Sequence, residues 1–305
     1  MRITVVGPGA VGLLLAARLS QAGAQVGILD YRPQRAQDLD REGFILEDEA
    51  GEHRLRVPAG AEPAALAQCD LALVCVKAYQ TEQVARTLAQ HLPAPARALT
   101  LQNGTGNVEA LARALGDERV LGGITSEGAT RLAPDRVRHA GRGQTHLGPA
   151  AGPVDDFSRQ VAALLERAGF QTQAVAGAQN LIWTKLLVNV GINALTAILG
   201  QPNGMLLELA GARSVMEGAV AEAQAVGQAL GIEFLHQDMQ EAVREVARRT
   251  GKNISSMLQD VRARRRTEVE FINGAVAAKG QELGIPTPIN ATLTQLVRAL
   301  EQQYL

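Results

Sequence analysis

The chain has 305 residues, of which 46% are hydrophobic and 20% are charged, a composition typical of a globular protein with one or two domains. Its formal net charge of -1 gives no overall basic field, so neither nucleic acid nor an anionic membrane is indicated as a partner. The two cysteines, Cys69 and Cys75, lack metal-ligand spacing, and we interpret them as core thiols in a reducing compartment. No metal site is expected.

The N-terminus and the apolar segments indicate a cytoplasmic protein. Met1 and Arg2 lead directly into an apolar strand pattern, so no signal peptide is expected. The apolar stretches are interrupted by polar residues or glycines before they reach membrane-spanning length. One cluster of arginines favours a solvated helix face over a nucleic-acid patch: Arg262, Arg264, Arg265 and Arg266.

Short apolar runs alternate with helical patterns in the first half of the chain. The helical spacing of Ala10–Ala22 lies between the first two runs. Such alternation predicts parallel strands joined by right-handed crossovers, hence a doubly wound sheet. Residues 138–148 are expected to form a late hairpin that closes this sheet. The predicted strands are Ile3–Val6, Gln25–Leu29, Leu71–Val76, Ala98–Leu101 and Val120–Ile124.

The second half of the chain carries only helical patterns. Strand signals stop at about Asn180, and the small residues of Ala174–Gln179 are typical of a connection between domains. We therefore expect an α/β protein, in which residues 1–175 form a dinucleotide-binding domain with a doubly wound parallel sheet. Residues 176–305 are expected to form an all-helical domain that carries the substrate and catalytic groups.

A glycine-rich loop follows the first predicted strand and opens the first helix. Gly7 permits a tight turn, Gly9 lets the backbone approach a pyrophosphate, and Gly12 lets the helix pack closely on the strand. The N-terminus of the helix supplies free N–H groups for the phosphates. This strand–loop–helix context favours dinucleotide binding over a merely structural turn. The predicted cofactor contacts here are Gly7, Pro8, Gly9, Ala10, Val11 and Gly12.

The end of the second predicted strand bears on cofactor preference. Asp30 is an acid at the position that usually binds the ribose hydroxyls of NAD. Arg32 and Arg35, by contrast, favour the 2′-phosphate of NADP. The residues by themselves leave both cofactors open.

Two further strand ends are predicted to face the same crevice, because ligands of open parallel sheets bind beyond the carboxyl ends of the strands. Lys77 follows the strand that ends at Val76, and Asn103 lies in the turn after Gln102. The alternatives are a solvated surface lysine and an ordinary turn asparagine beside glycine.

A stripe of polar side chains interrupts the otherwise apolar helix predicted over Asn180–Leu199. Lys185, Asn189 and Asn193 are spaced four residues apart and so share one face. A lysine among apolar neighbours needs a partner, and burial lowers its pKa. The stripe indicates a polar ligand cavity; a buried hydrogen-bond network or a lysine that reaches solvent is the alternative.

A helix predicted over Ser256–Lys279 has a carboxylate on its apolar side. Glu268 falls on one stripe with Val261 and Ile272, which makes it a natural partner for Lys185. Together an ammonium and a carboxylate are suited to carbonyl reduction, where an acid protonates the developing alkoxide. Ser256 begins a capping box, S-x-x-Q, so its hydroxyl either caps the helix or contacts a ligand.

Taken together, these motifs resemble the ketopantoate reductase (2-dehydropantoate 2-reductase) family over nearly the whole chain. The resemblance implies a Rossmann-type domain followed by an all-helical domain, with the active site in the cleft between them. The segments that carry it are Ile3–Gly12 (ITVVGPGAVG), Val76–Ala78 (VKA), Gln102–Gly104 (QNG), Trp183–Asn193 (WTKLLVNVGIN), Pro202–Gly204 (PNG), Ile254–Asp260 (ISSMLQD) and Thr267–Glu268 (TE).

The resemblance also implies a reaction, the reduction of 2-dehydropantoate to (R)-pantoate by NADPH on the route to pantothenate and coenzyme A. Lys185 matches the family's catalytic lysine, which donates a proton, and Glu268 matches its glutamate. The positions that contact cofactor or substrate match Lys77, Asn103 and Gly128. The substrate-binding positions match Asn189, Asn193, Asn203 and Ser256.

One position departs from the family pattern. The family arginine that takes the 2′-phosphate aligns with Tyr31, so Arg32 or Arg35 is the candidate in its place. We expect NADP as the cofactor, while Asp30 keeps NAD open.

Two alternative functions remain beside this one. The first is reduction of another small branched 2-keto acid, and the second is a dinucleotide-binding sensor without turnover. In every case the expected partner is a small molecule, and the apolar helices of the second half are compatible with a homodimer.

Overall fold

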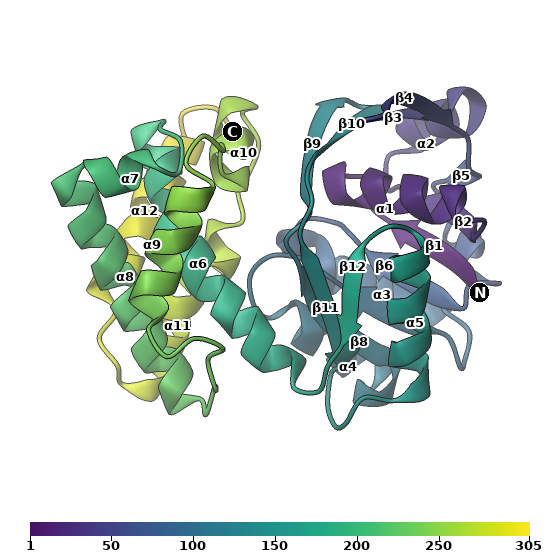
Figure 1. Ribbon diagram of the computed structural model, residues 1–305. Helices are drawn as coiled ribbons and strands as arrows, with labels where there is room; N and C mark the ends of the chain where they lie inside the picture. The colour runs from purple at the N-terminus through teal and green to yellow at the C-terminus, as the bar shows by residue number, and fades with distance from the viewer. The chain divides into compact units, whose positions relative to one another are not determined.

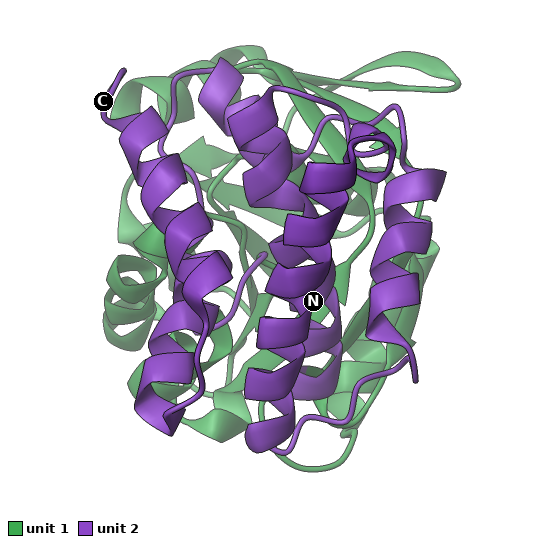
Figure 2. Cartoon of the chain, turned by 90° about the vertical axis from the view of Figure 1, so that its left-hand side faces the viewer, with its two compact units in different colours: residues 1–102, 107–178 green, residues 103–106, 179–305 purple.

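The computed structural model describes residues 1–305 and divides into two compact units, coloured separately in Figure 2. Unit 1 comprises residues 1–102 and 107–178, and unit 2 comprises residues 103–106 and 179–305. The chain therefore leaves unit 1 for four residues, Asn103–Gly106, and then returns to it. The sequence pattern gave no sign of this excursion.

The main sheet of unit 1 has eight strands in the order β12-β11-β8-β7-β6-β1-β2-β5 (Figure 1). Its neighbouring strands pair in parallel except for β11 with β8, which are antiparallel. The chain winds outward in both directions from β1 and β6, which confirms the predicted doubly wound sheet. The strands are β1 (Arg2–Val6), β2 (Gln25–Leu29), β5 (Ala59–Gly60), β6 (Leu71–Val74), β7 (Arg97–Thr100), β8 (Val120–Thr125), β11 (Gln144–Pro149) and β12 (Gln171–Ala174).

Helices connect the strands and bury their apolar faces on the sheet. The helix α1 is the most deeply buried, and Leu13, Leu14 and Leu19 on it have no exposed surface. The helix α5 begins at an N-cap aspartate, Asp155, whose carboxylate accepts a hydrogen bond from Ser158 N. The helices of unit 1 are α1 (Ala10–Gln21), α2 (Pro33–Glu42), α3 (Thr81–His91), α4 (Asn107–Leu115) and α5 (Asp156–Arg167), with short 3₁₀ turns η1 (Pro63–Leu66), η2 (Ala78–Gln80) and η3 (Asp117–Arg119).

A second sheet of four strands, in the order β4-β3-β10-β9, packs against α1. Its strands are β3 (Phe44–Asp48), β4 (Gly51–Leu55), β9 (Gly128–Ala133) and β10 (Arg136–Gly141). The predicted hairpin over 138–148 is wrong, because β10 belongs to this sheet and only β11 joins the main sheet. The chain passes from one sheet to the other between β10 and β11, and the alternation pattern does not tell the two sheets apart.

Unit 2 is all helical, as the sequence predicts. Gly191 of its long helix α6 lies so close to α8 and α9 that an added Cβ would meet Val220 and Val243 at 2.9 Å. By length and composition α6 could cross a membrane, but 72% of its most apolar window is buried inside the structure, as in a core helix. The helices are α6 (Ala178–Leu199), α7 (Met205–Glu208), α8 (Ala210–Ala229), α9 (Met239–Arg249), α10 (Ser256–Arg262), η4 (Val269–Phe271), α11 (Asn273–Leu283) and α12 (Pro288–Glu301).

The single helix predicted over Ser256–Lys279 is wrong. The chain forms α10, then a turn in which Arg264 adopts a positive φ of 51°, then η4 and α11. The run of arginines in this turn offers no apolar face to bury, so nothing keeps the helix continuous. The predicted capping box is also wrong, because Ser255 rather than Ser256 is the N-cap and accepts a hydrogen bond from Leu258 N, and Leu258 has no side chain that could bond back to the cap.

Candidate active site

The glycine loop of unit 1 is built as a close turn between β1 and α1. Gly7 has a φ of 94°, and an added Cβ there would meet Val76 at 2.6 Å. An added Cβ at Gly12 would lie 2.2 Å from Gly7 O, so the helix and the turn touch through backbone alone. Only glycine fits either position.

The same loop fits the pyrophosphate of a dinucleotide. Gly9 is the N-cap of α1 and has no side chain to bond the first N–H groups, and the first turn carries no acidic residue. These N–H groups and the positive end of the helix dipole are therefore suited to bind a phosphate. An added Cβ at Gly9 would stand 3.7 Å from Cys75 O, so the loop itself leaves the approach open.

Asp30, at the carboxyl end of β2, is fully buried and already has partners. Its carboxylate accepts hydrogen bonds from Nε of Arg35 and, at 3.1 Å, from the backbone N–H of Arg32. The guanidinium of Arg32 is exposed and stacks over the ring of Tyr31, 5.1 Å from its centroid. The basic group that faces solvent at this strand end is thus Arg32, whereas Asp30 is held by Arg35.

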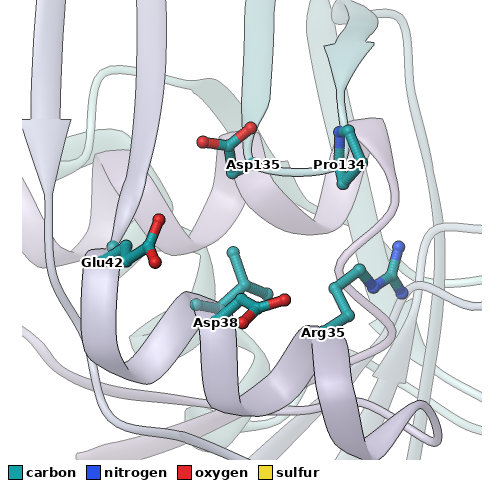
Figure 3. Close-up of a pocket in the computed structure, with 7 residues that line it drawn as sticks. Arg35, Asp38, Glu42, Pro134 and Asp135 are labelled. Atoms are coloured by element: carbon teal, nitrogen blue, oxygen red, sulfur yellow. The ribbon is translucent and has the colours of Figure 1, made fainter.

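Arg35 also borders a surface cavity of about 320 Å³ between α2 and the turn at Pro134 and Asp135. Figure 3 shows its guanidinium turned away from the carboxylates of Asp38 and Glu42 that line the same cavity. None of the glycine-loop residues lines this cavity, and its geometry adds nothing to the cofactor site.

The ends of β6 and β7 are tied together in unit 1. The amide of Gln102 donates hydrogen bonds to Val76 O at 2.7 Å and to the hydroxyl of Thr81 at 3.0 Å. Lys77 lies between these partners as the N-cap of η2. Gln102 is therefore a structural part of this strand end that the sequence pattern did not single out.

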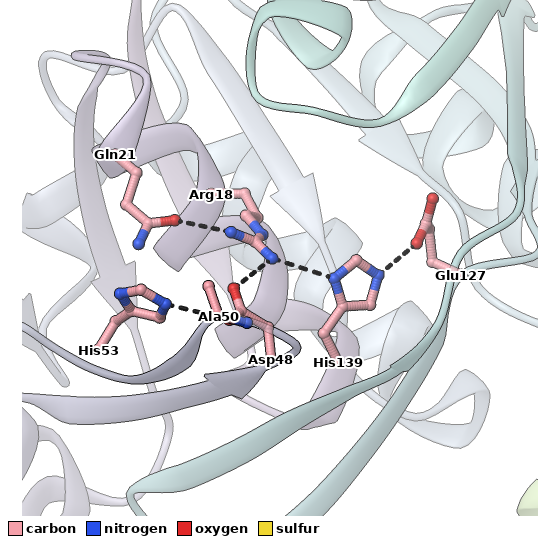
Figure 4. A network of polar contacts seen from close by, with 7 residues as sticks. All are labelled: Arg18, Gln21, Asp48, Ala50, His53, Glu127 and His139. Carbon is pink, nitrogen blue, oxygen red and sulfur yellow. Dashed lines mark hydrogen bonds and ion pairs between the residues drawn. The ribbon is translucent and has the colours of Figure 1, made fainter.

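Gly128 begins β9, where an added Cβ would lie 2.9 Å from Gly141 N on β10. The neighbouring Glu127 is buried and accepts a hydrogen bond from Nε2 of His139 at 2.6 Å. Arg18 donates to Nδ1 of His139 at 3.3 Å and to Asp48 at 2.7 Å, so the proton of the imidazole belongs on Nε2 (Figure 4). This network fixes the loop at the end of β8 to α1 and to the second sheet.

The polar stripe on α6 lies in unit 2 together with Asn103. The ammonium of Lys185 donates a hydrogen bond to Asn103 Oδ1 at 2.8 Å. Burial lowers the pKa of Lys185 to about 8, and the negative charge of Glu268 raises it. Glu268 is only 7% exposed, and its charge acts on Lys185, which is bonded to Asn103, so the predicted lysine, asparagine and glutamate belong to one cluster.

Glu268 reaches this place from a turn and not from a helix face. It precedes η4, and its neighbours Thr267 and Val269 are buried with it. The prediction that its carboxylate is buried is correct, although the helical stripe from which it was inferred does not exist.

The remaining predicted residues lie at the other end of the stripe and beyond it. Asn193 is buried, and its carbonyl accepts a hydrogen bond from Thr196, whose hydroxyl is 2.7 Å from the hydroxyl of Ser255, next to Ser256. Asn203 donates instead to the hydroxyl of Thr250 at 2.9 Å.

Two of these asparagines keep buried polar atoms without a hydrogen-bond partner. The atoms are Nδ2 of Asn189 and Oδ1 of Asn203. Such orphaned atoms are rare in folded proteins, and a bound water or a polar ligand would supply the missing partner.

The chain is similar to proteins of one family along nearly its whole length. The model for ketopantoate reductase PanE/ApbA matches residues 3–152, and the model for its C-terminal part matches residues 178–301. A 2-dehydropantoate 2-reductase of Halobacterium salinarum is 38% identical over 303 residues, which is 99% of both chains.

Two solved structures extend the similarity to three dimensions. A PanE/ApbA family ketopantoate reductase from Ralstonia eutropha JMP134 has a TM-score of 0.92 and 32% identity, covering 100% of this chain and 99% of that one. A ternary structure of D-mandelate dehydrogenase with NADH and anilino(oxo)acetate has a TM-score of 0.93 and 25% identity, with the same coverage.

Proposed function

The chain belongs to the ketopantoate reductase PanE/ApbA family, and from this premise we propose that it reduces 2-dehydropantoate to (R)-pantoate with NADPH, a step toward pantothenate and coenzyme A. It is an NAD(P)H-dependent oxidoreductase. The observation that carries the proposal is the set of Lys185, Asn103 and Glu268, in which an ammonium of lowered pKa is held between an amide and a carboxylate.

The proposed chemistry divides between cofactor and protein. NADPH, when bound, supplies the hydride that adds to the carbonyl carbon of the substrate. Lys185 donates a proton from Nζ to the carbonyl oxygen, which becomes the hydroxyl of the product. A pKa of about 8 leaves most of this group protonated at neutral pH and still acidic enough to transfer the proton.

The other residues orient the two reacting groups. Asn103 accepts a hydrogen bond from Lys185 and so fixes the direction of the ammonium. Glu268 provides a negative charge that keeps the ammonium protonated. Substrate hydroxyl and carboxylate groups are assigned to the polar side chains of Asn189, Asn193, Asn203 and Ser256.

We assign the cofactor preference to NADP. Lys77 and Gly128 are assigned to the cofactor beside the glycine loop, and Arg32 to its 2′-phosphate. Support comes from Asp30, which is fully buried and bonded to Arg35, so its carboxylate is already engaged by a cation. An acid in that state is a poor acceptor for the ribose hydroxyls of NAD.

One observation favours a second candidate, a reductase of another small branched 2-keto acid. The D-mandelate dehydrogenase structure has as high a TM-score as the ketopantoate reductase and was determined with NADH and anilino(oxo)acetate. The third hypothesis, a sensor without turnover, gains no support from Lys185, because a sensor has no use for a proton donor.

A panel of 2-keto acids, each assayed with NADPH and NADH by absorbance, tests the proposal. We expect 2-dehydropantoate with NADPH to have the highest kcat/KM. A higher kcat/KM for another keto acid would change the proposed substrate but would leave the proposed type of reaction unchanged. Tight NADPH binding without oxidation by any keto acid would favour the sensor.

A further inference from the structure

The segment 268–273 of unit 2 contacts each element that holds a proposed catalytic group. Glu268 begins it, and the charge of this residue acts on Lys185 of α6. At its centre, Phe271 O accepts a hydrogen bond from Thr105 N at 3.0 Å, within the loop that carries Asn103. At its end, Asn273 Nδ2 donates to Val190 O on α6 at 3.2 Å.

Gly104 makes the contact between the loop and this segment possible. Its φ is 83°, and an added Cβ would lie 2.5 Å from Phe271 O and 2.9 Å from Phe271 Cβ. The loop and the segment therefore touch through backbone, directly beside Asn103. A side chain at this position would push the loop away from Phe271 and take Asn103 with it.

Asn273 anchors the other end of the segment in the core. Its side chain is fully buried and donates a second hydrogen bond to Asn290 Oδ1 at 3.0 Å, while Asn290 donates to Ala219 O of α8. The Oδ1 atom of Asn273 has no partner. An apolar residue at this position would lose both hydrogen bonds and leave Asn290 Oδ1 without this donor, so the amide of Asn273 ties the segment to α6 and to α12.

We propose that Gly104 and Asn273 are positioning residues: by fixing the segment 268–273 against the loop and against α6, they hold Asn103 and Glu268 on the ammonium of Lys185. Neither residue touches the reacting groups, and both act through others. The expected effect of variants at these residues on kcat rests on the proposed function, whereas their expected effect on the titration of Lys185 does not.

The loop offers a matched pair of variants, Gly104→Ala and Gly106→Ala. Both replace a glycine of positive φ, 83° and 91°, but an added Cβ at Gly106 meets nothing within 4 Å. We expect Gly104→Ala to lower kcat by roughly 10- to 100-fold, the scale of a misplaced catalytic group, while Gly106→Ala keeps most of it. Equal kcat values in the two variants would overturn the role of Gly104.

The pKa of Lys185 gives a readout that needs no turnover. Lysine side chains are labelled with ¹⁵N and titrated by NMR, with the Lys185 signal assigned by its loss in Lys185→Met. In the wild type it should titrate near pH 8. In Gly104→Ala and Asn273→Ala the pKa should rise toward 10.5, because the displaced segment admits water, and burial, the largest influence on this group, outweighs the smaller opposite effect of moving the charge of Glu268 away.

A core variant separates positioning from loss of stability. Val226 of α8 is fully buried, so Val226→Ala lowers the melting temperature but should leave the titration of Lys185 unchanged. A wild-type titration in Asn273→Ala, or a shift in Val226→Ala as large as in Asn273→Ala, would overturn the positioning role. If the wild type reduces no keto acid, the proposed function fails, and the NMR comparison still decides this inference.

Discussion

At the scale of single residues, the protein places one ammonium where its charge is costly. Lys185 lies on an apolar helix, and burial lowers its pKa to about 8 although Glu268 opposes that change. A group held partly against its preferred protonation state is what a proton donor near neutral pH requires. Asn103 adds direction, because it accepts one of the three ammonium hydrogens.

Removing this ammonium should separate chemistry from binding. We expect Lys185→Ala to lower kcat by about 10²- to 10⁴-fold, the usual contribution of a general acid. The affinity for NADPH, measured by fluorescence titration, should stay near the wild-type value because the glycine loop is untouched. A variant with normal turnover would show that Lys185 is not the acid.

The pH dependence of reduction follows from the same residue. The donor must be protonated, so kcat should fall as the pH rises through about 8. Glu268→Gln removes the charge that raises the pKa of Lys185, so the fall should move to lower pH. The measurement is kcat for keto-acid reduction across pH 6–10, and an unchanged midpoint in Glu268→Gln would contradict the coupling.

Cofactor preference should depend on Arg32. Arg32→Ala is expected to lower the ratio of kcat/KM for NADPH to that for NADH by about tenfold or more, because a hydrogen bond to a charged group contributes about 1.5–3 kcal/mol. Arg41→Ala, which replaces an exposed arginine at the other end of helix α2, the helix that Arg32 precedes as N-cap, is the control. The assignment fails if the two variants lower the ratio equally.

At the scale of elements, the contact between the turn after β1 and the first turn of α1 forms the phosphate cradle. We expect Gly12→Ala to weaken NADPH binding and to lower the melting temperature, because the new Cβ would stand 2.2 Å from Gly7 O. Gly211→Ala on α8, where an added Cβ meets nothing within 4 Å, should not destabilise and serves as the control. Wild-type NADPH affinity in Gly12→Ala would contradict the close contact.

At the scale of the whole molecule, each unit has its own hydrophobic core. Leu13, Leu73 and Leu99 belong to the core of unit 1, and Leu187, Val190 and Met216 to that of unit 2. The glycine loop and Arg32 lie in unit 1, whereas the proposed proton donor lies in unit 2. Asn103, which follows β7 of unit 1 closely in the chain, belongs to unit 2 together with the rest of the segment Asn103–Gly106.

Two separate cores predict local protection by the cofactor. With NADPH at about 100 times its Kd, binding stabilises the folded state by about 2.7 kcal/mol. In hydrogen exchange, amides of residues 7–12 and 30–35 should be protected, while those of α8 exchange as before. Uniform protection along the whole chain would show that the two units open together.

The glycine loop and the polar stripe on α6 can be identified from sequence alone because each rests on a local pattern, whereas the family resemblance rests on several such motifs in order along the chain. To identify the loop from Gly7 to Gly12, it is enough to find a strand pattern before it and a helical pattern after it. Lys185, Asn189 and Asn193 share a face because a helix repeats every 3.6 residues. Neither conclusion depends on where distant segments lie.

Tertiary structure decided what depends on distant segments. The second sheet and the path of the chain from Ser256 to Lys279 are set by partners that no local pattern names. The same holds for Gly104 and Asn273, whose importance arises from the backbone of Phe271 and Val190. The sequence shows which groups are able to form hydrogen bonds and contacts, but tertiary packing determines which of them come close enough to do so.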